Sequence, residues 1–351
     1  MKKNKRFLIY ILVALAVFAM GCGHREGENV KNGFAAMEQS DYDTALQCFE
    51  QAIVAGEDLE TAYRGIGMTY MGMADYESAI HAFEYALDNA GIFAGDLERD
   101  INFYMATAYH KNGQPEEAVA LLDAVIESDK KNADAYYLRG VAKISMDDYE
   151  GCIYNFEKAM EYAEDSRSMK LDVYTVLADH GYEEKGRGYL TQLLDEEKDL
   201  SEYEQGVIYL YLQDYETARN LLENAKQAAK KDEKGEIIFM LGRTYEELGE
   251  HIYAGVMYSE YLSDNPDDAV VYNQLGLCKL EAGEAQAAVE AFETALALND
   301  ASMAQTLKYN QIVAYEYAGD FTKANALMKE YLAAYPDDAE AQREAKFLRT
   351  R

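Results

Sequence analysis

A small residue recurs about every 34 positions along most of this chain, always inside the same local pattern. An aromatic residue often lies three positions before it and a large residue four positions after it, as in Tyr76, Ala79 and Phe83. A sequence period of this length predicts a solenoid of stacked repeats. The repeating small residues are Ala45, Ala79, Ala118, Cys152, Gly186, Ala218, Ala254, Ala288 and Ala324.

Two sets of glycines indicate how each repeat is built. Spacings of three and four residues place the pattern on one face of a helix, and small residues let two antiparallel helices approach closely while the large residue fills the remaining gap. A glycine between two such faces ends a helix. Each period therefore predicts a helix, a turn and a second helix. Glycines twelve positions before the small residue are Gly33, Gly67, Gly140, Gly206, Gly242 and Gly276, and the helix-ending glycines are Gly113, Gly181, Gly249, Gly283 and Gly319.

The pattern resembles the tetratricopeptide repeat, most clearly at Gly67, Tyr70, Tyr76, Ala79, Phe83 and Ala86. The resemblance covers roughly residues 30–336 in about nine copies, and it implies an all-α, right-handed superhelical solenoid of helix-turn-helix repeats. The chain has no tryptophan, so the opening Trp of the family is replaced by tyrosine or lost, and the closing proline remains only as Pro266 and Pro336. The tyrosines at the opening position are Tyr63, Tyr136 and Tyr272.

The fifth copy, at about residues 167–198, departs most from the pattern. Gly186 takes the place of the small alanine, and Lys170 lies where an aromatic residue is expected. We therefore expect loose packing and any hinge in this copy. Residues 337–351 carry alanines among charges and predict a closing helix, so residues 29–351 form one solenoid domain with a capping helix.

The first residues have the composition of an export signal. Basic residues at positions 2–6 precede an uncharged, mostly apolar run from Phe7 to Met20, and Gly21 and Cys22 follow. This order predicts a signal peptide over residues 1–21, and the run is short for a membrane span. Gly21-Cys22 resembles the bacterial lipobox, although Ala19 stands where the family has leucine. The resemblance implies lipidation at Cys22 and a chain anchored on the extracytoplasmic face of a bacterial cell membrane. Ordinary cleavage and an uncleaved anchor remain open.

Residues 22–28 are a short tether, because a chain extends about 3.5 Å per residue and this segment reaches only roughly 20 Å. The repeats would therefore begin close to the lipid headgroups.

The chain is strongly acidic, with a net charge of −31. Such a charge argues against nucleic acid as a partner and against adsorption to anionic lipid. The acidic residues are spread through every repeat, so they serve either as a solvated surface or to steer a basic partner, and both readings remain open.

No arrangement of residues predicts catalysis, a metal site or a cofactor. Cys48, Cys152 and Cys278 lie in three different repeats and are expected to be buried small residues rather than disulfide partners. Acidic turns that include Asp268 and Asp338 are expected to cap helices rather than to bind calcium, since they lack the glycine and distal glutamate of a calcium loop. The histidines lack metal-ligand spacing; they are His24, His81, His110, His180 and His251.

The function that the sequence favours is binding of a protein or peptide partner through a surface of the repeats. Tyrosine and methionine are frequent at interaction surfaces because they combine apolar area with a polar group or with adaptability. The alternative is that these residues pack between repeats. The resemblance places a concave groove on the first helices, and only two arginines, Arg64 and Arg243, occupy positions in it. A set of basic residues that binds the carboxylate of an acidic C-terminus is therefore not expected. The other groove residues are Phe34, Met37, Met68, Met71, Phe103, Tyr137, Tyr203, Tyr211, Phe239, Tyr309 and Tyr317.

These observations predict a membrane-anchored, non-catalytic scaffold that binds a partner through its concave face. A fixed structural subunit of a cell-envelope assembly or secretion complex is the alternative.

Overall fold

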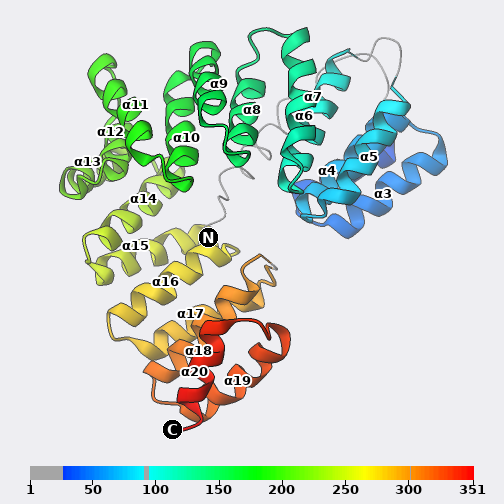
Figure 1. Ribbon diagram of the computed structural model, residues 1–351. Helices are drawn as coiled ribbons and strands as arrows, with labels where there is room; N and C mark the ends of the chain where they lie inside the picture. Colours follow the sequence, from blue (N-terminus) through cyan, green and yellow to red (C-terminus); the bar gives the residue numbers. More distant parts are fainter. Residues whose placement is uncertain (1–26, 91–94, 301) are drawn as a thin grey trace. The chain divides into compact units, whose positions relative to one another are not determined.

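A computed structural model describes residues 27–90, 95–300 and 302–351 (Figure 1). Over these residues the chain forms 19 α-helices and one short 3₁₀-helix, and this part of the chain contains no strand. Within the same ranges no helix has both the length and the apolar composition needed to cross a membrane. The predicted signal peptide, the lipidation site at Cys22 and His24 lie outside the described residues.

The helices follow one another as nine pairs and a closing helix, which confirms the predicted helical repeat solenoid (Figure 1). The first helices of the pairs are α2 (Glu28–Glu38), α4 (Leu59–Gly72), α6 (Gly95–Lys111), α8 (Ala133–Ser145), α10 (Ser166–Asp179), α12 (Glu202–Tyr211), α14 (Lys234–Glu247), α16 (Ala269–Glu281) and α18 (Ala304–Tyr317). The second helices are α3 (Tyr42–Ala55), α5 (Tyr76–Asp88), α7 (Pro115–Ser128), α9 (Tyr149–Tyr162), α11 (Glu183–Glu196), α13 (Tyr215–Ala228), α15 (His251–Asp264), α17 (Ala285–Ala297) and α19 (Phe321–Ala334). The 3₁₀-helix spans Lys231–Glu233, and α20 (Ala339–Leu348) closes the array.

Each repeat turns between its two helices at a residue with positive φ, five positions before the small residue. The five glycines predicted as helix ends all take this conformation. The backbone amide of the next residue donates a hydrogen bond to the carbonyl five residues earlier, as the Asp75 amide does to the Tyr70 carbonyl at 3.0 Å. This bond gives a partner to a carbonyl that has none within the helix. Four repeats make the same turn without glycine, at Ser40, Ala74, Asp147 and Gln213.

Aspartates begin many of the helices. Asp75 accepts a hydrogen bond from the Ser78 amide at 3.1 Å and caps α5. Asp268 and Asp338 cap α16 and α20 in the same way, which confirms capping as the role of these acidic turns. Such caps satisfy amide groups that the first turn of a helix leaves without a partner.

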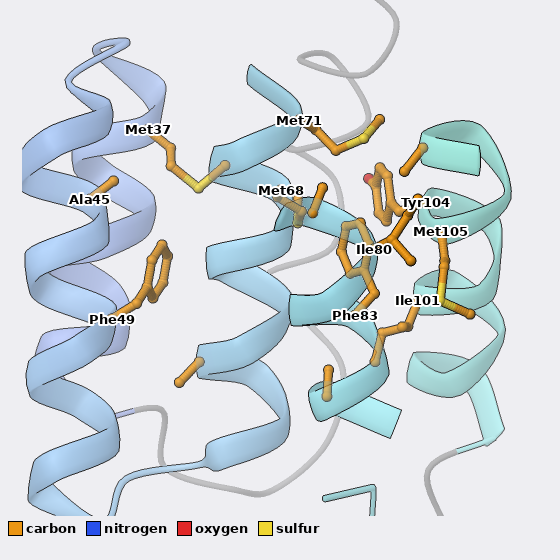
Figure 2. Packing of buried hydrophobic residues seen from close by; sticks show 14 of the residues in the cluster. Met37, Ala45, Phe49, Met68, Met71, Ile80, Phe83, Ile101, Tyr104 and Met105 are labelled. Atoms are coloured by element: carbon orange, nitrogen blue, oxygen red, sulfur yellow. The ribbon is translucent and has the colours of Figure 1, made fainter. Parts of the chain in front are cut away.

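The core is a seam of small and large residues between adjacent helices. Ala45 and Phe49 are fully buried on α3. The ring of Phe49 lies against two glycines, and a Cβ would come within 2.6 Å of it at Gly33 on α2 and within 2.4 Å at Gly65 on α4. Figure 2 labels Phe49 and, one repeat later, Phe83, whose ring would lie 2.5 Å from a Cβ at Gly67. A single ring therefore fills the space beside the first helix of its own repeat and that of the next.

The chain divides into two compact units, one up to Gly186 and one from Arg187 onward. The boundary falls within α11, in the fifth repeat. Gly186 itself is closely packed, contrary to the loose packing predicted there, and the predicted hinge stays a prediction. Gly186 is buried, and a Cβ there would lie 2.9 Å from Cδ2 and 3.2 Å from Cα of Tyr174 on α10. The glycine at this position permits close approach of the two helices.

Candidate protein-interaction site

In the first unit, an arginine links the first helices of three successive repeats. The guanidinium of Arg64 on α4 lies 6.0 Å from the ring centre of Phe34 on α2 and 5.7 Å from that of Tyr104 on α6. Its Nε donates to Asp100 Oδ2 at 2.6 Å. Cations over aromatic faces and charge-assisted hydrogen bonds both hold such a side chain in one position. The sequence placed Phe34 and Arg64 in the groove, and the structure brings them together.

Tyr104 beneath this arginine stays a neutral phenol. Burial raises its pKa to about 12, the charge of Asp100 adds to the rise, and Arg64 acts in the opposite direction. Phe103 is half-buried and meets the Tyr104 ring edge-on at 6.3 Å. The cluster therefore presents aromatic surface and one cation that is already paired.

In the second unit, three of the predicted groove residues lie on the first helices α12 and α14. The Tyr203 hydroxyl donates to Glu236 Oε2 at 2.9 Å. The guanidinium of Arg243 lies 5.6 Å from the centre of the Tyr211 ring. Phe239, which lies between Glu236 and Arg243 on α14, is half-buried against Tyr258 and Tyr261, with ring centres 6.1 and 5.6 Å away. We call Tyr203, Tyr211, Glu236, Phe239 and Arg243 the α12–α14 face.

The remaining predicted residues differ in their exposure. Met37, Met68 and Met71 belong to the buried core of the first repeats (Figure 2). Tyr137 and Tyr309 are half-buried, and each rests on a ring of the second helix of its own repeat, at 5.7 Å from Phe156 and Tyr331 respectively. Tyr317 at the end of α18 is 70% exposed. Partner binding by all of these residues stays a prediction.

The sequence reading missed the two acidic residues of these clusters. Asp100 follows Arg64, and Glu236 follows Tyr203, at about one repeat length. The residues at the matching positions of the next first helices are Phe103 and Phe239, and each acid lies three residues, about one helical turn, before them. This shared offset was a usable signal. It was missed because both acids lie among many others in an acidic chain.

The described cysteines, Cys48, Cys152 and Cys278, are free thiols, and two of them are buried. Burial, together with a nearby carboxylate, raises the pKa of the Cys152 and Cys278 thiols to about 12, so both remain protonated. Across the described ranges, no group of three or more His, Cys, Asp or Glu residues is arranged to hold a metal ion.

Comparison with known proteins identifies the repeats. Family models described as tetratricopeptide repeat match residues 70–144, 133–166, 269–302 and 307–338. The chain therefore contains tetratricopeptide repeats, as the sequence predicts, and such repeats are typically non-catalytic scaffolds for protein interaction.

Several solved structures are similar to this chain. A tetratricopeptide repeat protein from Parabacteroides merdae is 14% identical over 82% of this chain and 97% of its own, with a TM-score of 0.46. PilW, described as a widely conserved type IV pilus biogenesis factor, is 15% identical over 70% and 97%, with a TM-score of 0.45. YrrB, described as a TPR protein with an unusual peptide-binding site, is 20% identical over 64% and 97%, with a TM-score of 0.37.

Proposed function

We propose that this tetratricopeptide repeat chain is a non-catalytic scaffold that binds a protein or peptide partner on its first helices. We further propose that it acts on the extracytoplasmic face of a bacterial cell membrane, anchored by a lipid on Cys22. The first part rests on the repeats and on the α12–α14 face, and the second part rests on the N-terminal sequence.

The α12–α14 face is the observation that supports partner binding. Two of its tyrosines are held in place, one by the hydrogen bond to Glu236 and the other by Arg243 above its ring. Rings that are already fixed lose little conformational entropy when a partner binds. Tyrosine and arginine are also the residue types that contribute most to binding at protein interfaces. The arrangement suits an apolar segment with polar groups at its edges.

Site-specific crosslinking in cells tests this proposal. A photoreactive phenylalanine replaces Tyr203 in the full chain, and the same group replaces the exposed Tyr154 on the second helix α9 as a control. We expect a discrete adduct from the position of Tyr203 and none of that size from the position of Tyr154. Loss of the adduct in Phe239→Ala would assign it to this face. Equal labelling at both positions would contradict the proposal. An adduct that resists exchange with added partner would favour a fixed subunit of an envelope complex.

The anchor is supported by the basic start, the apolar run from Phe7 to Met20 and the Gly21-Cys22 junction. Only residues 23–27 separate Cys22 from the start of α2, so the repeats would lie near the membrane. Cys22→Ala is expected to move the protein from the detergent phase to the aqueous phase. If the variant partitions into detergent as the parent does, the lipid anchor is wrong.

A further inference from the structure

The second helix of the seventh repeat, α15, carries a group of exposed apolar side chains. Ile252 is 65% exposed, Tyr253 is 59% exposed and Val256 is 53% exposed. Ile252 and Val256 are four residues apart and share a face, with Tyr253 beside them. The Tyr253 ring stacks on Tyr245 at 5.5 Å, so it is held in place. We call Ile252, Tyr253 and Val256 the α15 patch (helix labelled in Figure 1).

Apart from the contact of Tyr253 with Tyr245, α15 packs in its repeat through other residues than the patch. Ala254 and Tyr258 are the fully buried residues that pack α15 against α14. Two ion pairs join α15 to α13, from Arg219 to Glu250 at 3.2 Å and from Lys226 to Glu260. Their acids lie before and after the patch, so these contacts hold the helix and leave Ile252 and Val256 exposed.

The other repeats show that an apolar residue is not required at the position of Ile252. This position lies two residues before the repeating small residue, and polar residues occupy it in all other copies. Those residues are Asp43, Glu77, Glu116, Glu150, Glu184, Glu216, Gln286 and Thr322. An exposed isoleucine therefore belongs to this repeat alone, and exposed apolar side chains that gather in one place mark interaction sites.

The acidic residues on the same helix indicate the charge that a partner of the α15 patch would carry. Glu260 and Asp264 continue the four-residue spacing from Ile252 and Val256, and both are exposed. Asp267, in the turn after α15, is exposed as well. The exposed face of α15 is thus apolar over its first half and acidic over its second half. A second copy of this chain would bring another net charge of −31 to the contact, and like charges across an interface disfavour association.

We propose that the α15 patch docks an amphipathic helical segment of another protein whose apolar face is bordered by lysine or arginine. Its apolar side chains cover Ile252, Tyr253 and Val256, and its basic side chains face Asp264 and Asp267. Amphipathic helices bind apolar surfaces in this manner with anchors at three- and four-residue spacing. The patch lies on a second helix, so this contact is separate from the α12–α14 face.

Two synthetic helical peptides test the proposal against the full-length protein. They share one leucine face, which is bordered by lysines in one peptide and by glutamates in the other, and binding is followed by fluorescence anisotropy. The variant Ile252→Glu with Val256→Gln introduces residue types that other repeats carry at these positions, as in Glu77 and Gln47. Val54→Gln is the matched control, because Val54 is an 89% exposed valine on the second helix α3.

We expect the lysine peptide to bind the parent at least about tenfold more tightly than it binds the double variant, and about tenfold more tightly than the glutamate peptide binds the parent. Val54→Gln and Tyr211→Ala should leave this affinity unchanged. Equal binding of both peptides, or binding that survives the double substitution, overturns the proposal. Self-association in sedimentation, or binding to phosphatidylcholine vesicles, that the double substitution abolishes would assign a different occupant and also overturn it.

Discussion

Gly276 lies directly against the ring of Phe292, sixteen residues later in the same repeat. A Cβ on Gly276 would lie 2.5 Å from Phe292 Cε1, closer than two carbon atoms can approach without movement. Phe292 is fully buried. Five other repeats place a glycine against a large residue at the same separation. These pairs are Gly33 and Phe49, Gly67 and Phe83, Gly140 and Phe156, Gly206 and Leu222, and Gly242 and Tyr258.

Gly276→Ala should therefore destabilise the protein. An alanine in a helix is ordinarily more favourable than glycine by up to about 1 kcal/mol, but the added methyl group collides with a ring that has no free space. We expect a net loss of about 1–3 kcal/mol in urea unfolding. Combining it with Phe292→Leu should cost less than the sum of the single changes, because the shorter side chain relieves the collision.

Gly255→Ala is the matched control for this change. Gly255 is also buried within a helix of the second unit, but its nearest neighbour would lie 3.7 Å from the new Cβ, which is an ordinary contact. This variant should be neutral or more stable by up to about 1 kcal/mol. Equal losses of stability in the two variants would show that contact with the ring is not the reason why glycine is required at these positions.

Ala74→Gly should stabilise the second repeat. Ala74 has a φ of 59° in the turn between α4 and α5 and is exposed. A left-handed conformation costs an ordinary residue roughly 1 kcal/mol, and glycine avoids that cost. We expect a gain of up to about 1 kcal/mol in thermal or urea unfolding. The reverse change, Gly283→Ala at a φ of 77° in the eighth repeat, should lose a similar amount, and a gain there would contradict the account.

The turns show how far the sequence could predict the fold. The period and the helix faces predicted all nine pairs, and glycine marked five of the turns. The turns at Ser40, Ala74, Asp147 and Gln213 carry no such mark, because the hydrogen bonds of the helix end impose the left-handed conformation on whatever residue lies there. Spacing marked the glycine and the large residue of each repeat, but it did not show that Gly276 and Phe292 touch, since that contact depends on how the two helices pack.

The candidate site was less predictable than the fold. The resemblance places Met37, Met68 and Met71 in the groove of the first helices, but the structure shows that they are buried in the core. The resemblance also places Tyr203, Tyr211 and Phe239 in the groove, and the structure shows these three half-buried on α12 and α14. The difference arises because the exposure of a side chain depends on the adjacent repeat, which a single helical pattern does not describe.

Gly186→Ala should destabilise the fifth repeat, contrary to the neutral or stabilising effect expected from a loosely packed copy. The new methyl group would meet the ring of Tyr174 at 2.9 Å and its backbone at 3.2 Å, and backbone moves less readily than a side chain. We expect a loss of about 1 kcal/mol or more in urea unfolding. Gly188→Ala on the same helix, where nothing lies within 4 Å, is the control. A gain in stability from Gly186→Ala would instead support loose packing of the fifth repeat.

Glu316→Gln should stabilise the C-terminal repeat at neutral and alkaline pH. Burial raises the pKa of Glu316 to about 7, and a hydrogen bond with Glu344 on α20 and the charge of that residue add to the rise. A raised carboxyl pKa means that the stability contributed by the protonated acid is complete below about pH 4.5 and is lost as pH rises through about 7. The advantage of the glutamine variant in urea unfolding should therefore grow from pH 5 to pH 8. The exposed Glu330 on α19 provides the control substitution. A constant advantage across this range would show that the raised pKa is not the cause.

Partner binding should depend on the aromatic side chains of the first helices more than on the net acidity of the chain. Tyr137→Ala, Tyr203→Ala and Phe239→Ala should each weaken binding of the crosslinked partner by on the order of 2 kcal/mol where the residue is a principal contact. Phe239 and Tyr137 also pack against rings of their own repeats, so circular dichroism must show that the helix content is retained.

Tyr154→Ala, which removes a similarly large exposed ring from a second helix, should leave binding to the first helices unchanged. Raising the salt concentration should weaken binding only modestly, because screening acts on exposed charges whereas ring contacts are apolar. Binding that tolerates the three aromatic substitutions but disappears in salt would instead assign the partner to the acidic surface.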